Sequence, residues 1–260
     1  MLISVLTFQS ILGFFVVSEK MKVGYSRKIV HFLIHSLPVL FVILLPSYEI
    51  EGDSFEDDTT LEDKMSINEL LWQQVLVIFY LGSLTKPLRR GSSILLLSFR
   101  SIDRPEDRPY TLAWIASQTI WVYIFVCCMF MWLLTKSNKL GLVFLPLIVS
   151  NIGDGLAEPV GLRFGKHKYK TRALWYDGKF CTGSFTRSIE GSAAVFLVTV
   201  VTVIGYYLTD YFTATQFIAA MLIMPIGFTL GEAFSPHTWD NPFIVAIGFF
   251  FTWFCLDVVR

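Results

Sequence analysis

Five carboxylates stand out because they lie within or beside apolar stretches, where ionisable groups are costly. They are Asp154, Glu158, Glu190, Glu232 and Asp240. A charged side chain inside a bilayer costs roughly 2.5 to 3.5 kcal/mol on insertion scales, so such a residue is by default a candidate for function. Acidic oxygens bind magnesium and accept protons from hydroxyl groups. We therefore take these residues as the first candidates for catalysis or metal binding.

The segment GDGLAEPVGLRFGKHK, residues 153–168, holds two of these acids at an informative spacing. If the segment is helical, Asp154, Glu158, Gly161 and Gly165 share one face. Two carboxylates one turn apart, beside glycines that permit close approach, suit a magnesium ion shared with phosphate oxygens. This pattern predicts a metal and phosphate site on that face.

A simpler interpretation of the same segment stays open. Pro159 would remove a helix hydrogen bond, so the segment could be a kinked, glycine-packed helix end. Its carboxylates would then only pair with Arg163 or Lys166. Against this, the other acidic candidates map to the same end of the predicted helices.

Basic and small residues follow this segment and could hold a polyphosphate. Lysine and arginine supply positive charge, and a helix N-terminus with serine and glycine offers unpaired amide groups to an anion. An excess of basic residues is also what any cytoplasmic loop shows, so this interpretation competes with simple membrane topology. The candidates are Lys166, Lys168, Arg187, Ser188, Gly191 and Ser192.

Two further segments carry polar groups beside apolar runs. GEAFSPHTWDN, residues 231–241, combines Glu232, Asp240 and Asn241, and could complete a metal or hydroxyl site. Its alternative is a loop in which Asp240 or Asn241 caps the next helix. RKIVH, residues 27–31, places Arg27, Lys28 and His31 at the start of a predicted helix, where a lone histidine is more often a core residue.

These residues must be positioned by membrane helices. The chain of 260 residues is 54% hydrophobic and 16% charged, more apolar than one soluble core requires, so we predict an integral membrane protein. Crossing the hydrocarbon takes roughly 20 apolar residues. Eight runs approach that length, near residues 1–17, 29–46, 68–85, 110–135, 140–162, 190–209, 213–234 and 241–258. We predict an all-α, polytopic transmembrane bundle of about eight helices in one domain, residues 1–260.

The distribution of charge predicts which side of the membrane holds the site. All but four of the 21 Lys and Arg residues lie in three alternate loops of the eight-helix arrangement, and the opposite face carries the acidic loop 49–69. Cytoplasmic loops collect positive charge, so we expect the basic loops and the candidate site on the cytoplasmic side. The organelle stays open between endoplasmic reticulum, plastid and bacterial inner membrane. The short apolar stretch 92–99 is predicted to be interfacial or re-entrant.

Several classes of function are disfavoured. The 21 basic residues balance 21 acidic ones, which argues against a nucleic-acid partner, and the four cysteines have no paired spacing that would suit zinc or a disulfide framework. No P-loop, protein-kinase, zinc-protease or GxSxG motif is present. A bound nucleotide would therefore be held by the ends of membrane helices.

The order of the motifs RKxxH, GDGLAEPVGLRFGKHK, RSIEGS and GEAFSPHTWDN resembles the polyprenol kinase family. This family includes phytol kinases, dolichol kinases and CTP-dependent diacylglycerol kinases, and it is similar to CTP transferases. The resemblance implies transfer of the γ-phosphate of CTP, or of another nucleoside triphosphate, to the hydroxyl of a lipid alcohol, with Mg²⁺ or another divalent cation.

The resemblance also implies roles for matching residues. Asp154 and Glu158 fall in the acidic metal or catalytic motif, with Glu232 as a further metal candidate. Asp154, Glu190 or Asp240 would orient or deprotonate the lipid hydroxyl, a choice that stays open. Gly161, Gly165, Lys166, Lys168, Arg187, Ser188, Gly191 and Ser192 would surround the nucleotide, and Arg27, Lys28, His31 and Asn241 are further candidates.

Two other functions compete with this one. A cytidylyltransferase would attach CMP to phosphatidate, but its GHGGxxDR signature is absent. A transporter with broken helices would place acids near the bilayer centre and would show inverted repeats, which the sequence lacks. The sequence does not distinguish phytol, farnesol, a polyprenol or diacylglycerol as acceptor, and it does not indicate the oligomeric state.

Overall fold

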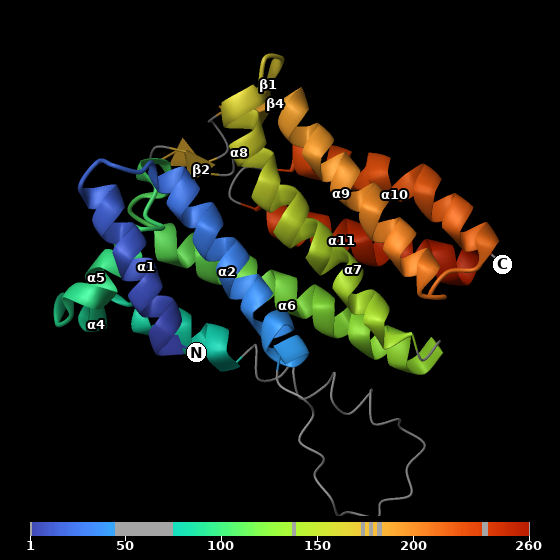
Figure 1. Cartoon of the computed structure of the whole chain (residues 1–260), viewed down its shortest axis with the longest axis horizontal. Helices are drawn as coiled ribbons and strands as arrows, with labels where there is room; N and C mark the ends of the chain where they lie inside the picture. The colour runs from blue at the N-terminus through green and yellow to red at the C-terminus, as the bar shows by residue number, and fades with distance from the viewer. Residues whose placement is uncertain are drawn as a thin grey trace, which may run out of the picture.

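A computed structural model describes residues 2–44, 75–136, 139–172, 175–176, 179–180, 184–235 and 239–259. The predicted third span, residues 68–85, lies partly outside these ranges, and the acidic loop 49–69 lies outside them entirely. Residues 75–83 are helical. Figure 1 shows the helices packed side by side as one bundle, with a small β-structure at one end.

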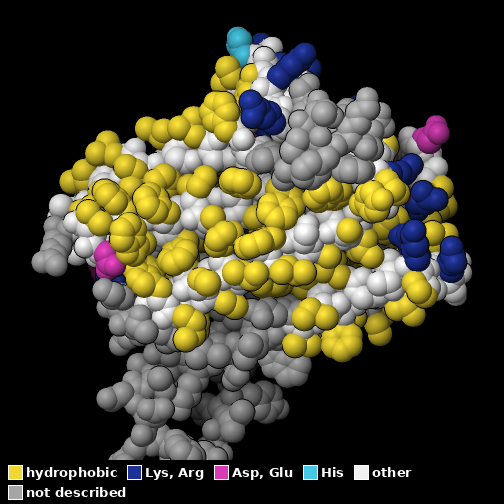
Figure 2. Space-filling view, turned by 180° about the vertical axis from the view of Figure 1, so that it is seen from behind, with side chains coloured by type: hydrophobic (Ala, Val, Ile, Leu, Met, Phe, Trp, Pro, Cys, Tyr) yellow, Lys and Arg dark blue, Asp and Glu magenta, His cyan; other side chains and the backbone are white. Residues whose placement is uncertain are grey.

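The fold is an all-α membrane-type bundle, as predicted. In the described part of the chain, five helical segments are long and apolar enough to cross a bilayer: Thr111–Leu133, Gly141–Phe164, Ile189–Leu208, Ala214–Phe234 and Asp240–Val258. Each matches one of the predicted spans within a few residues. Their outward faces are apolar, and Figure 2 shows one side of the molecule covered by a broad belt of hydrophobic side chains, with basic side chains at its edge. A surface of this kind fits a lipid environment.

The helices of the bundle are, in chain order, α1 (Leu2–Val17), α2 (Val23–Leu44), α4 (Lys86–Arg90), α5 (Ser93–Arg100), α6 (Thr111–Lys136), α7 (Phe144–Ile148), α8 (Gly155–Phe164), α9 (Ile189–Leu208), α10 (Ala214–Phe234) and α11 (Asp240–Trp253). Short 3₁₀ segments lie at η1 (Pro105–Asp107) and η2 (Leu140–Val143), and π-helical segments at η3 (Val149–Asp154) and η4 (Phe254–Val258).

The predicted first span, residues 1–17, packs against the short apolar stretch 92–99. α1 has 16 residues, fewer than a full crossing requires. α5 has 8 residues and lies against α1, where Gln9 Nε2 donates to the Ser98 carbonyl oxygen over 2.9 Å. Ser98 Oγ donates to the Leu6 carbonyl oxygen over 2.8 Å. The stretch predicted to be interfacial or re-entrant is therefore a short helix tied to α1 by buried polar contacts.

The predicted span 140–162 is a broken helix. It begins as 3₁₀ helix η2, continues as α7, passes through π-helix η3 and ends as α8. The irregularity ends at Asp154, whereas Pro159, the predicted cause of a kink, lies inside α8. π-segments of this kind often occur at functional sites.

The basic loop predicted between the fifth and sixth spans contains β-strands that the sequence analysis did not anticipate. β1 (Lys168–Arg172) pairs antiparallel with β4 (Ser184–Ser188), and Tyr169 lies opposite Arg187. β2 (Trp175–Tyr176) pairs with β3 (Lys179–Phe180). Because β4 runs directly into α9, the strand pair sets where Arg187 and Ser188 enter the bundle.

Two clusters of buried apolar side chains hold the bundle together. The larger one contains residues of α6, α7, α9, α10 and α11. It includes Leu133, Leu145 and Phe228, each with no exposed surface. The smaller one joins α1, α2, residues 75–83 and α5, and includes Leu84 and Phe99. The N-terminal half of α2 contacts α8 and η3, so the two clusters meet where the candidate residues of both halves lie.

Candidate functional site

A polar cavity of about 300 Å³ lies at the end of the bundle where α2, α9 and α11 begin and α8 and α10 end. Its wall brings together the four segments that the sequence analysis singled out, at the start of α2, in η3 and α8, at the junction of β4 and α9, and from the end of α10 to the start of α11. The charged residues that line it are Arg27, Lys28, Arg104, Asp154, Glu158, Lys168, Arg187, Glu232 and Asp240. Helix ends therefore hold the site, as expected in the absence of a P-loop.

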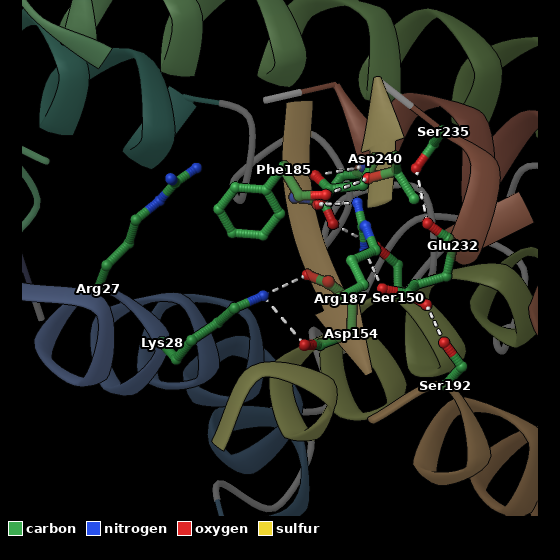
Figure 3. A network of polar contacts seen from close by, with 12 residues as sticks. Arg27, Lys28, Ser150, Asp154, Phe185, Arg187, Ser192, Glu232, Ser235 and Asp240 are labelled. Atoms are coloured by element: carbon green, nitrogen blue, oxygen red, sulfur yellow. Dashed lines mark hydrogen bonds and ion pairs between the residues drawn. The ribbon is translucent and has the colours of Figure 1, made fainter. Parts of the chain in front are cut away.

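Asp154 is held by a lysine from the far side of the cavity. It ends the π-helix η3, is 4% exposed and faces α2. Lys28 Nζ donates to Asp154 Oδ2 over 2.7 Å and to the Asp154 carbonyl oxygen over 2.9 Å, as Figure 3 shows. Asp154 is therefore paired with Lys28 and not, as the alternative interpretation had it, with Arg163 or Lys166.

Lys28 interacts with more than one acid. Asp154, Glu158 and Asp240 all attract its ammonium group electrostatically. A single ammonium charge among three carboxylates offsets part of their negative charge. Lys28 is thus the positive centre of the acidic wall, a role that its place in the RKxxH motif alone did not specify.

Arg187 is the second positive centre, and it lies near the end of β4. Its side chain is 9% exposed, and its guanidinium pairs with Glu232 at the end of α10 and lies 3.5 Å from Asp240 Oδ2 at the start of α11. Ser192 Oγ donates to the other oxygen of Glu232 over 3.0 Å. Figure 3 shows these side chains converging from β4, α9, α10 and α11. One arginine therefore joins two acids that lie far from it in the sequence.

The N-terminus of α9 lies close to α8 because small residues face each other there. A Cβ atom on Gly161 would lie 2.6 Å from Ser188 Oγ, and one on Gly191 would lie 2.6 Å from the Ala157 carbonyl oxygen. Ser188 caps α9, its Oγ accepting from Gly191 N over 3.1 Å. This contact brings the first turn of α9 to the cavity wall.

We expect Ser188→Ala to lower the free energy of unfolding by about 1 kcal/mol, the usual loss for a helix N-cap. Because Ser188 also lines the cavity, we expect the variant to weaken binding of the nucleotide that the sequence analysis predicts there. Thr213→Ala is the matched control, since Thr213 caps α10 in the same way but lies outside the cavity lining. Thermal unfolding and nucleotide titration of both variants check this. Equal loss of affinity in the two would show that the cap acts on stability alone.

Arg104 is a cavity residue that the sequence analysis counted only as loop charge. It is 5% exposed, and its Nε lies 2.8 Å from Asp107 Oδ2, an oxygen that Arg27 Nη1 approaches to 3.3 Å. Burial raises the pKa of the Asp107 carboxyl, and Arg104 opposes part of that rise. The loop before α6 is thereby joined to α2. Nothing in the spacing of RPEDR indicated that this arginine reaches the site.

Asn241 makes a contact that extends the site toward the broken helix. Its Oδ1 accepts from Ser150 Oγ in η3 over 3.0 Å. α11 begins at Asp240 with Trp239 as its N-cap, so Asp240 and Asn241 are its first two residues and neither is the cap considered as an alternative. Ser150 was not among the predicted residues.

Most predicted site residues line the cavity, and a few lie elsewhere. Glu190 does not line it, and its Oε1 lies 2.9 Å from His167 Nδ1 at the base of the strand pair. Gly165 packs against Ser188, and Lys166 is exposed outside the lining. The predicted residues found in the lining are Arg27, Lys28, His31, Asp154, Glu158, Gly161, Lys168, Arg187, Ser188, Gly191, Ser192, Glu232, Asp240 and Asn241.

The carboxylates of the cavity determine whether it could hold a divalent metal. Among the described residues, no three Asp, Glu, His or Cys side chains gather as a ligand set. Glu232, the third predicted ligand, is engaged by Arg187 and Ser192 instead. Magnesium, however, is usually held by one or two carboxylates together with substrate phosphates. Asp154 and Glu158 line one cavity a helical turn apart and supply this kind of donor pair, but Lys28 engages Asp154, so a metal would have to displace that ammonium group.

No family model, no curated protein and no solved structure matches this chain. The resemblance to polyprenol kinases therefore stays a prediction that depends on the four motifs. The class of the molecule that the structure supports is a multi-pass, all-α membrane protein with a charged cavity at one end of its helices.

Proposed function

We propose that this protein is a membrane lipid kinase that transfers the γ-phosphate of CTP, or of another nucleoside triphosphate, to the hydroxyl of a lipid alcohol. The observation that carries the proposal is the cavity itself. Five cationic and four acidic side chains line one space at the ends of helices whose outer faces are apolar. Phosphoryl transfer from a soluble nucleotide to a lipid needs such a junction of charge and hydrocarbon.

The cations on the wall suit a triphosphate. Arg187 and Arg104 offer planar guanidinium groups that bind phosphate oxygens in pairs, and Lys168 adds a mobile charge at the rim. The first turn of α9 lies at the cavity wall, and the positive end of its helix dipole favours an anion there, although the Gly191 amide itself donates to Ser188 Oγ. These groups offset the charge that grows on the leaving nucleoside diphosphate.

In the proposed reaction the lipid hydroxyl oxygen forms a bond to the γ-phosphorus, and the bond from that phosphorus to the bridging oxygen breaks. Nucleoside diphosphate leaves with the bridging oxygen, and the hydroxyl proton passes to a carboxylate and then to water. A magnesium ion held by Asp154 and Glu158 would neutralise charge on the phosphates. Positioning and charge account for most of such catalysis.

The decisive assay uses purified protein in detergent with CTP, ATP and GTP labelled in the γ-phosphate, and with phytol, farnesol, dolichol and diacylglycerol as acceptors. Label that appears in a lipid phosphate supports the proposal and names both donor and acceptor. Transfer of CMP to phosphatidate would establish a cytidylyltransferase instead. Turnover that no lipid stimulates with any nucleotide would contradict both and leave the transporter.

Two acids that were equal candidates for the base should now behave differently. Asp240→Asn is expected to lower the turnover number roughly a hundredfold, the lower end for a general base, because Asp240 lines the cavity. Glu190→Gln should keep turnover within about twofold, since Glu190 pairs with His167 outside the lining. Initial rates at saturating CTP check this. A larger loss in Glu190→Gln than in Asp240→Asn would reverse the assignment.

A further inference from the structure

A second cavity, of about 160 Å³, lies deeper in the bundle between α2, residues 75–83, α6 and α7. Its wall is mainly apolar and includes Val77, Leu81, Ile115, Val122, Val126 and Leu147. No charged side chain other than Arg27 lines it among the described residues. A space with this lining takes hydrocarbon in preference to a polar group.

The second cavity adjoins the charged one. Arg27, His31 and Asn241 line both, so these three residues form the boundary where the two meet. Ser150, which donates to Asn241, also lines the apolar side. A molecule seated in the apolar cavity would therefore present its end to the residues that face the phosphate site.

Gln118 provides an independent sign of a ligand. It lies in the lining of the apolar cavity and is 5% exposed, and its Nε2 has no hydrogen-bond partner among the described residues. A buried amide donor without an acceptor is costly, so such a group indicates a missing oxygen. The preceding residue, Ser117, accepts from Trp239 Nε1 over 3.3 Å, which places this turn of α6 beside the start of α11 and the boundary.

The size of the cavity limits what it can hold. A buried apolar cavity of about 150 Å³ accommodates benzene, which is a ring of six carbons. A space of about 160 Å³ thus admits the first few carbons of one chain. It is too small for a glycerol backbone with the beginnings of two ester-linked chains.

We propose that the apolar cavity binds the hydroxyl-bearing end of a lipid alcohol with a single hydrocarbon chain, and that Gln118 donates a hydrogen bond to its hydroxyl oxygen. The inference rests on the proposed kinase function and specifies its acceptor. The hydroxyl then lies at the boundary formed by Arg27, His31 and Asn241, facing the nucleotide. We expect a single-chain alcohol to be preferred over diacylglycerol as the acceptor.

Binding is tested without nucleotide, using a farnesol analogue that carries a photoreactive diazirine near its hydroxyl. After irradiation of the purified protein in nanodiscs, we expect labelled residues within 77–81 and 115–126, and loss of labelling with excess farnesol but not with dioleoylglycerol. Labelling elsewhere, or equal competition by dioleoylglycerol, overturns the proposal. Labelling as expected with no phosphate transfer supports the cavity and refutes the kinase function, so the two failures are distinguishable.

Variants test the same cavity through kinetics. Val122→Phe should fill the space and raise the KM for farnesol at least tenfold, with the KM for CTP unchanged. Gln118→Leu should raise the KM for farnesol to a similar extent. Ile124→Phe is the matched control, because Ile124 lies on the same helix, is 43% exposed and is not in the lining. Unchanged farnesol KM in both cavity variants, with kinase activity retained, would overturn the inference and leave the kinase function standing.

Discussion

Arg187→Met is expected to lower phosphate transfer to lipid by roughly a thousandfold or more, the scale on which arginines act in phosphoryl transfer. Arg187 is the buried cation on the wall that also organises it, since it pairs with Glu232 and lies near Asp240. Its removal takes away a charge that we propose binds phosphate, and it removes the contacts that position Glu232 and Asp240. Initial rates with labelled nucleotide, at saturating donor and acceptor, measure the loss.

The same substitution should destabilise the protein, because it leaves Glu232 buried without its partner. Glu232 is 2% exposed, and breaking a buried ion pair by removing one member costs roughly 3 to 5 kcal/mol. Adding Glu232→Gln to Arg187→Met should restore most of this stability by removing the stranded charge. Thermal unfolding of the unmodified protein and of the two variants reports the recovery.

Comparison of the single and double variants separates the two roles of Arg187. If the arginine binds phosphate, the double variant regains stability and remains inactive. Activity that returns together with stability would show that Arg187 only holds the fold. Arg187→Lys is a useful intermediate, since it keeps the charge but cannot reach two acids with one planar group.

Asp154→Asn is the second change with a large expected effect, a loss of roughly a hundredfold to ten-thousandfold in turnover. The carboxylate is buried, lines the cavity and pairs with Lys28. Asparagine keeps its size while removing the charge needed to hold magnesium with the phosphates or to take a proton. The magnesium concentration that gives half-maximal residual turnover should rise.

A double-mutant cycle with Lys28→Met shows whether Asp154 serves the substrate or only the lysine. If the pair is structural alone, removing both partners should recover the activity that either single variant loses. If Asp154 acts on the substrate, the double variant stays at the level of Asp154→Asn. We expect the second result. In Asp154→Asn, Glu158 and Asp240 still attract Lys28 and would keep it in place, so the loss in that variant does not come from a displaced lysine.

Much of the bundle could be predicted from hydrophobic length alone. Five of the predicted spans correspond to apolar helices, and their ends agree closely because polar or capping residues such as Ser188 and Thr213 precede them. The convergence of Asp154, Arg187 and Asp240 followed from assigning all three to the same ends of the helices. These predictions needed only local pattern and membrane topology.

Partners across the bundle could not be predicted in this way. The contact of Lys28 with Asp154 joins residues 126 positions apart, and it depends on how α2 packs on η3. Arg104 reaches the cavity because Asp107 and Arg27 hold its loop. Likewise, charge in the segment after α8 concealed the alternation of β1, in which Tyr169 and Thr171 are less exposed than their neighbours.

The π-helix at Val149–Asp154 fixes the direction in which the acids point. A π-segment fits about one residue more into its turns than an α-helix, and each α-helical residue rotates the chain by about 100°. A continuous α-helix over the same residues would therefore turn α8 by about that angle relative to α7. Asp154 and Glu158 would then leave the cavity while every apolar residue of the span stayed in the membrane. The length of this helix determines that it crosses the bilayer, whereas its rotational phase determines whether Asp154 and Glu158 join Glu232 and Asp240 in the cavity wall.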